Sequence, residues 1–324
     1  MKKTIKNAMS SLTAKLAALL FAFTCAGTAW GADVAKIGDT PYASIDGAFT
    51  AAQAGDTITL LADVTPSFTD PMAITQASVI DLNGKTLNIT KGDLRWGTTT
   101  FKNGNIVVDP SVHPSTAVFY MFGNKTLTFD NVKITATGVS GTYIIDLENA
   151  NSELNIVNGS EIILDNASAT SLTAVIAANG THHTIVIDDS TATVKNVGTF
   201  ILFGDDITIK GTSDIALENI AKRGILVKAG ATLSVEDTAK VTVSGTEPLY
   251  GGIYVADNTS KYIVADTATV TSSVTLPEGY DPNAALYGTK VADGFYQNGT
   301  YYADSTDFYI TNLNGLKYFR DLVN

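Results

Sequence analysis

Short apolar segments of three kinds recur in a fixed order between about residues 116 and 274, and this repeat limits the possible folds more than any other feature. One kind is marked by Leu127, Leu154, Ile185, Ile207, Leu233 and Ile263, with steps of 27, 31, 22, 26 and 30 residues. Each repeat unit therefore holds three short strands that alternate apolar and polar residues. Such strands bury an apolar face only when successive units stack. The sequence predicts an all-β fold, a parallel β-helix with three strands in each coil.

Residues that suit tight bends separate the second and third strands of each unit. They are Asp130-Asn131, Asn158-Gly159, Asp188-Asp189, Lys210-Gly211, Glu236-Asp237 and Asp266. Asn, Asp and Gly tolerate a left-handed backbone or bond their own backbone. A row of antiparallel sandwiches also uses short strands, but it does not predict three columns that advance together. Thr-x-Thr steps at residues 57–59 and 126–128 are expected in different columns, which leaves no flat threonine ladder for binding ice.

The first 31 residues have the layout of a secretory signal peptide. Lysines at positions 2, 3 and 6 precede an apolar run over residues 16–25 and a small-residue site at residues 29–31. The run is shorter than the roughly 20 residues needed to span a bilayer. Cys25, the single cysteine, lies inside this leader. We therefore expect a secreted or cell-surface protein, with no disulfide, cysteine nucleophile or transmembrane segment in the mature chain.

The two ends of the repeat region differ from its middle. Ile45, Ala48, Phe49 and Ala52 follow a helical spacing, with Ser44 as N-cap and Gly55 as stop. Residues 32–66 are thus predicted to be an N-terminal cap, made of a helix and a first strand, and residues 67–275 the β-helix. Residues 276–304 are predicted to be an irregular segment with an Asn-Gly hairpin over 295–302. Residues 305–324 are predicted to be a C-terminal helix, either a lid or the start of another module in a chain that continues past Asn324.

The opening of the chain resembles a known family. The matching residues are Ile37 to Thr40, Tyr42 to Ile45, Ala51-Ala52 and Ala54 to Leu61. They are similar to the start of right-handed, pectin-lyase-like β-helix modules in large secreted or surface proteins of bacteria. The resemblance is close over residues 34–64 and extends to the later coils only in pattern. It implies a right-handed coil and export, but not an activity, because that superfamily holds lyases, hydrolases, adhesins and inert stalks.

The charge balance excludes a general nucleic-acid binder. The chain carries 21 basic and 32 acidic residues, and without the leader 17 basic residues remain, for a net charge of −15. A nucleic-acid binder needs a basic surface to neutralise phosphates. Polysaccharides or host and matrix surfaces are the partners that fit an exported protein of this kind.

The chain contains only fragments of the catalytic sequence motifs of the pectin-lyase-like enzymes. Asp205-Asp206 resembles one piece of the galacturonan hydrolases, and Asp188-Asp189 is a second acidic pair, but no Gly-His-Gly or Arg-x-Lys accompanies them. Both pairs lie at predicted turns, where aspartate is expected. Arg223 is the candidate base if the protein is a lyase. These five residues are therefore the low-priority catalytic candidates.

Metal and cofactor sites are not expected. His182 and His183 are adjacent in a strand and face opposite sides, so they cannot readily share a metal. Together with His113 they are interpreted as surface polar residues. The acidic turns lack a calcium-loop spacing, which leaves at most weak Ca²⁺ binding.

Exposed aromatic rings are candidates for stacking on sugars. Trp96 is predicted on an exposed bend, while Tyr250 and Tyr254 lie in one later coil. The leading hypothesis is a structural or adhesive β-helix module that binds glycans without catalysis. The alternative is a polysaccharide lyase or glycoside hydrolase on the same scaffold.

Overall fold

A computed structural model describes residues 32–67, 78–112, 114–166, 168, 170–245 and 252–275, and the backbone of residues 73–74 and of short strands between 289 and 302. The chain divides into two units between Asp33 and Val34, and the described residues from Val34 onward are treated by themselves. The predicted signal peptide, His113, Tyr250 and the helix predicted over residues 305–324 lie outside the described residues.

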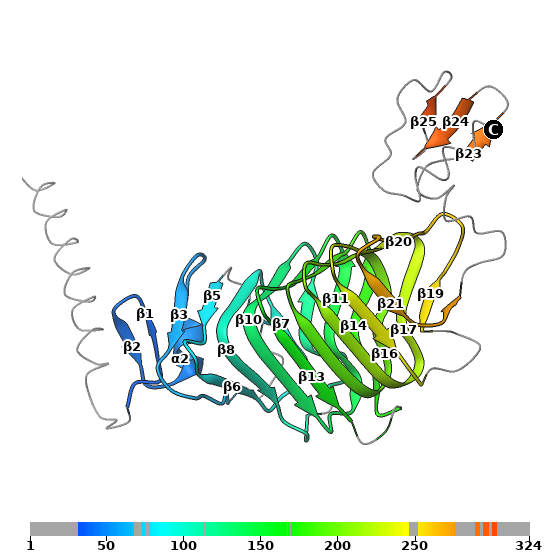
Figure 1. Cartoon of the computed structure of the whole chain (residues 1–324). Helices are drawn as coiled ribbons and strands as arrows, with labels where there is room; N and C mark the ends of the chain where they lie inside the picture. Colours follow the sequence, from blue (N-terminus) through cyan, green and yellow to red (C-terminus); the bar gives the residue numbers. More distant parts are fainter. Residues whose placement is uncertain are drawn as a thin grey trace, which may run out of the picture. The chain divides into compact units, whose positions relative to one another are not determined.

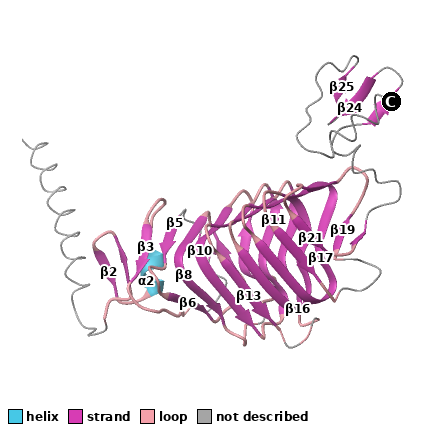
Figure 2. Cartoon of the chain, viewed as in Figure 1, coloured by secondary structure: helices cyan, strands magenta, loops and turns pink. Residues whose placement is uncertain are grey.

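The described chain is all-β and winds into a parallel β-solenoid of three strand stacks (Figures 1 and 2). Stack A contains β4 (Ala73–Ile74), β7 (Leu94–Trp96), β9 (Ala117–Phe122), β11 (Gly141–Ala150), β14 (Leu172–Thr181), the middles of β16 (Thr191–Lys210) and β17 (Asp214–Val235), β19 (Ile253–Val255) and β22 (Val274–Thr275). Stack B contains β3 (Thr57–Leu60), β5 (Ser78–Asp81), the first halves of β8 (Thr99–Val108) and β10 (Thr126–Thr137), β12 (Glu153–Val157), β15 (Thr184–Asp188), the ends of β16 and β17, and β20 (Lys261–Val264). Stack C contains β6 (Thr86–Ile89), the second halves of β8 and β10, β13 (Glu161–Asp165), the starts of β16 and β17, β18 (Lys240–Val243) and β21 (Thr269–Thr271).

The register confirms the predicted columns with one exception. In stack B the paired residues run Leu127, Leu154, Ile185, Ile207 and Leu233, in one row. The next residue in this row is Tyr262, so the assignment of Ile263 to it was wrong by one position. Ile263 instead pairs with Ser234 on the outer side of stack B. The step from Leu233 to the next residue of the row is one residue shorter than the sequence pattern indicated, so it ends at Tyr262.

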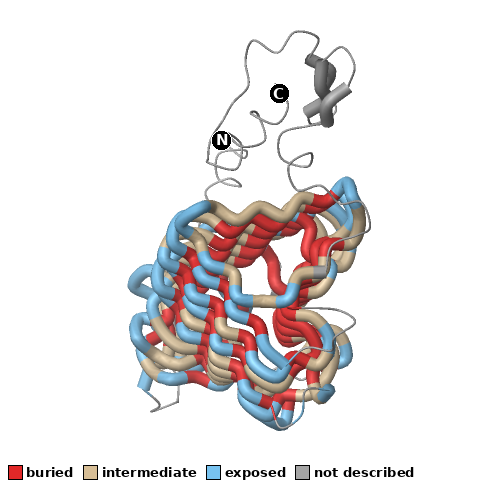
Figure 3. Tube along the Cα trace, turned by 45° about the vertical axis from the view of Figure 1, so that its right-hand side comes forward, coloured by how far each residue is buried: buried red, intermediate tan, exposed pale blue. Residues whose placement is uncertain are grey.

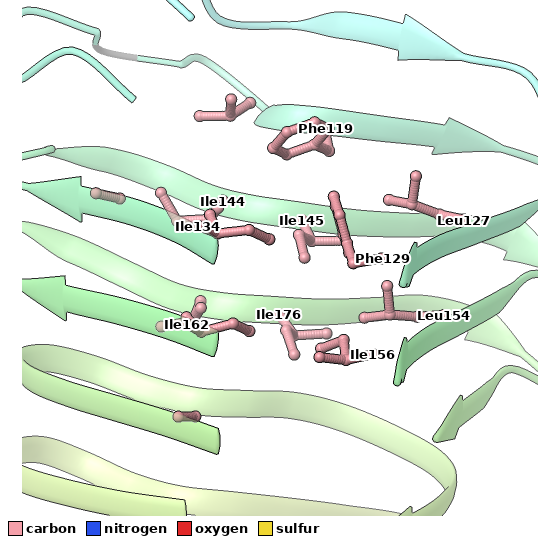
Figure 4. Packing of buried hydrophobic residues seen from close by; sticks show 14 of the residues in the cluster. Phe119, Leu127, Phe129, Ile134, Ile144, Ile145, Leu154, Ile156, Ile162 and Ile176 are labelled. Carbon is pink, nitrogen blue, oxygen red and sulfur yellow. The ribbon is translucent and has the colours of Figure 1, made fainter. Parts of the chain in front are cut away.

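The interior is one continuous apolar core along the coils. Buried residues line the inside of the coils, and exposed residues concentrate at the bends (Figure 3). Leu127 lies over Leu154, and Ile134 over Ile162 (Figure 4). Removing each such side chain from water stabilises the fold by about 1.5–3 kcal/mol.

Asparagine, aspartate and glycine form the tight corner between stacks B and C, as predicted. Asn103, Asn131 and Asn158 have φ of 57°, 56° and 55°, in the left-handed region that Asn tolerates. Asn131 Nδ2 donates a hydrogen bond to Asn103 Oδ1 at 3.3 Å, and Asn158 Nδ2 donates one to Asp130 Oδ1 at 2.8 Å. These bonds link successive coils along the corner.

The predicted N-terminal helix is confirmed as α2 (Ile45–Ala51). The Gly47 amide donates to Ser44 Oγ at 3.1 Å, which caps the helix as expected. The helix ends at Ala51, before the turn that contains Gly55. Phe49 packs edge-on against Trp96, with ring centroids 6.1 Å apart, so the helix contributes to the apolar core.

Antiparallel strands flank the parallel coils in the sequence. β1 (Ala35–Ile37) pairs with β2 (Thr40–Tyr42) and with β3, and therefore occupies the N-terminal edge of stack B. The predicted hairpin over 295–302 is confirmed by the pairing of β24 (Gly294–Gln297) with β25 (Thr300–Tyr302). A third strand, β23 (Thr289–Val291), joins it.

The Thr-x-Thr steps do not lie in different columns as expected. Thr57 pairs with Val79, Val79 with Thr100 and Thr100 with Thr128, all in stack B. The row is nevertheless broken by Val79 and, beyond Thr128, by Asn155. A continuous threonine ladder is absent from this row because other residues interrupt it.

Candidate functional site

The two predicted acidic pairs lie at different corners of the coils. Asp188 and Asp189 are at the corner between stacks B and C, where Asp188 Oδ2 lies 3.2 Å from Lys210 Nζ. Asp189 Oδ1 accepts hydrogen bonds from the amide and hydroxyl of Thr212, at 2.9 and 3.0 Å. These bonds, the amide bond first, hold the pKa of Asp189 below its ordinary value. This pair therefore links one coil to the next.

The second pair lies between stacks A and B and is itself divided. Asp206 is exposed at the start of a stack B strand, in register with Thr184. Asp205 is buried, and its Oδ2 accepts a hydrogen bond from the His183 amide at 3.0 Å. Lys228 Nζ lies 3.5 Å from Asp205 Oδ1. The two carboxylates of this pair thus have different surroundings.

Ser152, His183 and Asp205 stand on three successive coils and match the residue types of a hydrolase triad. Their contacts do not match one, because the Ser152 amide donates to His183 Nδ1 at 3.2 Å and Asp205 binds the His183 backbone. Ser152 and His183 are fully buried. Burial lowers the pKa of His183, and the charge of Asp205 opposes this shift. The interpretation of His183 as a surface residue was wrong; its ring forms part of the joint between coils.

Asp146 is a buried carboxyl that the sequence analysis missed. It is in register with Tyr120 and Ala177, on the outer side of stack A. It is only 2% exposed, and Asn179 Nδ2 donates a hydrogen bond to its Oδ1 at 2.8 Å. Burial raises the pKa of Asp146 to about 6, although the Asn179 bond acts to lower it. The available signal was an acid at an outer position within the apolar run of residues 143–147.

Two exposed phenylalanines lie on strands of stack A. Phe122 is 58% exposed and Phe203 is 42% exposed. Phe203 lies at a bulge with φ of 56°, and every other described residue with positive φ is Asn, Asp, His or Gly. A bulky side chain in this region is strained, and such strain concentrates at functional positions.

Phe122, Asp146, Asn179 and Phe203 come from β9, β11, β14 and β16, which are consecutive strands of stack A. The ring centroid of Tyr120 lies 6.3 Å from that of Phe122. We call these five residues the aromatic strip. It combines two exposed rings with the partly exposed amide of Asn179, which is bonded to the buried carboxyl of Asp146 beneath it. Rings and amides are groups that a sugar-binding surface uses.

The aromatic residues singled out from the sequence occupy other places. Trp96 is 3% exposed and packs among Phe49, Phe101 and Phe119, so its prediction on an exposed bend was wrong. The guanidinium of Arg223 lies 4.7 Å from the centroid of the Tyr254 ring. Arg223 and Tyr254 are therefore engaged with each other on stack A.

Within the part of the chain that the structure describes, no group of three or more His, Cys, Asp or Glu side chains is arranged to hold a metal ion. No helix of this part combines the length and hydropathy that a bilayer crossing requires.

Comparison with known proteins gives no family or relative: no protein-family model matches the chain, and neither the curated proteins nor the solved structures contain a match.

Proposed function

We propose that the chain is an exported β-helix module that binds oligosaccharides along the aromatic strip and carries out no chemistry of its own. The observation that supports this most is the exposure of Phe122 and Phe203 on strands of one stack. Exposing an aromatic ring of this size to water is unfavourable. Exposed apolar patches on soluble proteins often mark the surface that a partner covers. A pyranose ring offers such a partner, because its C–H face packs on an aromatic ring while its hydroxyls bond polar neighbours.

The spacing of the strip favours an oligosaccharide over a single sugar. Phe122 and Phe203 are three strand spacings apart along the stack, about 14 Å at 4.8 Å per strand. Asp146 and Asn179 come from the two intervening strands. A glycan lying across the strands meets a ring at each end and the partly exposed Asn179 amide between them, while Asp146 is buried and holds that amide in place.

The export of the module is part of the same proposal. Residues 1–31 act as a signal peptide and are removed, and the mature chain works in the medium or at the cell surface. The resemblance of residues 34–64 to pectin-lyase-like modules of bacterial surface proteins supports a common origin with them, and with it a right-handed coil whose N-terminal end is covered by α2. Polysaccharides of a host or of its matrix are then the surfaces to which it adheres.

The proposal of a binding role without catalysis rests on how the acidic residues are used. Asp188, Asp189 and Asp205 bond to groups on neighbouring coils, and Asp206 is exposed on a different stack from the strip. Hydrolysis of a glycosidic bond uses two carboxyl groups facing one substrate, about 5–9.5 Å apart. The predicted candidates do not supply such a pair on the strip.

An array of acidic and neutral plant and host oligosaccharides, probed with the mature protein with and without calcium, tests the proposal. We expect binding that the double variant Phe122→Ala, Phe203→Ala weakens at least tenfold. Leu61→Ala is the matched control, because Leu61 is 38% exposed and lies outside the strip. The proposal is refuted if no oligosaccharide on the array binds the protein, or if the double variant and the wild type bind with equal affinity.

A second candidate function is a polysaccharide lyase or hydrolase, and Asp146 is the observation that favours it. A carboxyl with a pKa of about 6 retains its proton in roughly half of the molecules at pH 6 and in roughly a tenth at pH 7, so it supplies a general acid under mildly acidic conditions. Release of reducing ends or unsaturated products from the same glycans, lost in Asp146→Asn and retained in Asp206→Asn, establishes this alternative in place of the binding module.

A further inference from the structure

In two successive coils, the turn between stacks B and C contains fewer residues than in the coils on either side. Measured against the neighbouring coils, two residues connect the stacks in β8, Asn103 and Gly104, and two in β10, Asn131 and Val132. The coil before them uses four residues, from Leu82 to Lys85, and the coil after them uses three, from Asn158 to Ser160. The shorter turns lie between longer ones, so the corner has a recess.

A hollow of about 450 Å³ occupies this recess. Gly84 and Gly159 belong to the longer turns on either side, and no atom lies within 4 Å of where a Cβ would project from either. These two turns are three strand spacings apart, about 14 Å. We call the hollow the corner notch. The remaining lining residues are Asn103, Gly104, Asn105, Asn131, Lys133 and Glu161.

The notch presents hydrogen-bonding groups and no net charge. Lys133 Nζ and Glu161 Oε2 form an ion pair at 2.8 Å, so their charges cancel. Asn131 Nδ2 donates to Asn103 Oδ1, and no hydrogen bond from another described residue to Asn131 Oδ1 is found. For Asn105, no side-chain hydrogen bond to another described residue is found. The lining therefore offers donors and acceptors together, without an aromatic ring.

These features select the class of ligand. A phosphate or carboxylate ligand needs a surplus of positive charge, which the Lys133–Glu161 pair does not provide. An apolar ligand needs an apolar lining. A hydroxyl both donates and accepts, so a polyhydroxylated molecule matches this mixture of amide groups and paired charges. The volume lies in the lower part of the range of small-molecule sites, about 300–1,000 Å³.

We propose that the corner notch is a binding site for a neutral sugar of one or two pyranose rings, separate from the aromatic strip. The sugar hydroxyls bond the Asn105 amide, the free carbonyl of Asn131 and the exposed side of the Lys133–Glu161 pair. Because no ring stacks on the sugar, the affinity is in the millimolar range, where many copies of the protein or repeated sugar ends give useful avidity.

Saturation-transfer NMR and amide chemical-shift titration of the mature protein test this site, with cellobiose, maltose and N,N′-diacetylchitobiose as neutral probes and digalacturonate as the charged comparator. We expect saturable millimolar binding of at least one neutral probe. Asn105→Leu should weaken it at least tenfold, whereas Asn155→Leu, an outward-facing asparagine of β12 outside the notch, should leave it unchanged.

A second variant keeps the test independent of folding defects. Gly159→Asn places a side chain at the wall of the notch at a φ of 81° that Asn tolerates better than most residues, and thermal melts show whether the coil is intact. The Phe122→Ala, Phe203→Ala double variant should bind the disaccharides normally, so failure of the strip and failure of the notch are distinguishable. The proposal is overturned by absence of saturable binding up to about 50 mM, by preference for digalacturonate, or by equal losses in Asn105→Leu and Asn155→Leu.

Discussion

Replacing Asp146 by Asn should make the protein more stable at neutral pH. The substitution keeps the size of the side chain and an oxygen that accepts the 2.8 Å hydrogen bond from Asn179. It removes only the ability to ionise. In the wild type the carboxylate must form in a site that is 2% exposed, and burial disfavours the charged form.

The magnitude follows from the displaced pKa. Burial raises the pKa of Asp146 from 3.8 to about 6, and each unit corresponds to about 1.4 kcal/mol, which sets an upper value of about 3 kcal/mol. Solvent screening and local relaxation reduce this, so we expect about 1–2 kcal/mol. The folded state binds the proton more tightly than the unfolded state, so the stability of the wild type declines as pH rises from about 4 to 6.

Urea unfolding of the mature wild-type and variant proteins at pH 4, 5, 6 and 7.5 measures this effect, with two spectroscopic probes compared because repeat proteins can unfold in steps. The free-energy difference should be near zero at pH 4 and reach its full value above pH 6. Asp206→Asn is the matched control, since Asp206 is exposed, and its effect should stay within about 0.5 kcal/mol. A difference that is constant over this pH range, or a destabilised variant at pH 7.5, refutes the reasoning.

Four further substitutions test the packing, the corner and the strain. Ile185→Ala, in the middle of the stack B row, should cost about 2–5 kcal/mol in urea unfolding, while Ile263→Ala on the outer side should cost less than about 1 kcal/mol; equal costs contradict the register. The Thr212 bonds hold the pKa of Asp189 low, so its carboxylate stabilises the folded state above about pH 4, and this stabilisation is lost as the pH falls below that value. Asp189→Asn should therefore reduce the loss of unfolding free energy at acid pH, and an unchanged dependence on pH contradicts this role. Phe203→Asn should raise the melting temperature by relieving the positive φ, and a lower melting temperature would show that the ring stabilises the fold.

The sequence predicts where the aspartates of the corners lie, but not which residues they contact. The sequence indicates turns at residues 188–189 and 205–206; the structure has a bend at Asp189, whereas residues 205–206 lie within β16 at a register shift between stacks A and B. The sequence does not indicate that Asp205 contacts His183, because these residues are 22 positions apart and meet only when their coils stack. Trp96 shows the same limit, since its burial results from packing against Phe49 of α2 and Phe119 of the next coil.

The sequence by itself determined the strand columns, because the alternation of apolar and polar residues sets which side of each strand faces inward, and it determined the bends, because Asn, Asp and Gly tolerate the left-handed backbone. Only the tertiary structure decided which residues of different coils become neighbours. That choice depends on the number of residues in each turn, which shifts Tyr262 into the row expected for Ile263 and opens the corner notch. It also depends on burial by distant segments, which sets the protonation of Asp146 and leaves Phe122 and Phe203 exposed on one stack.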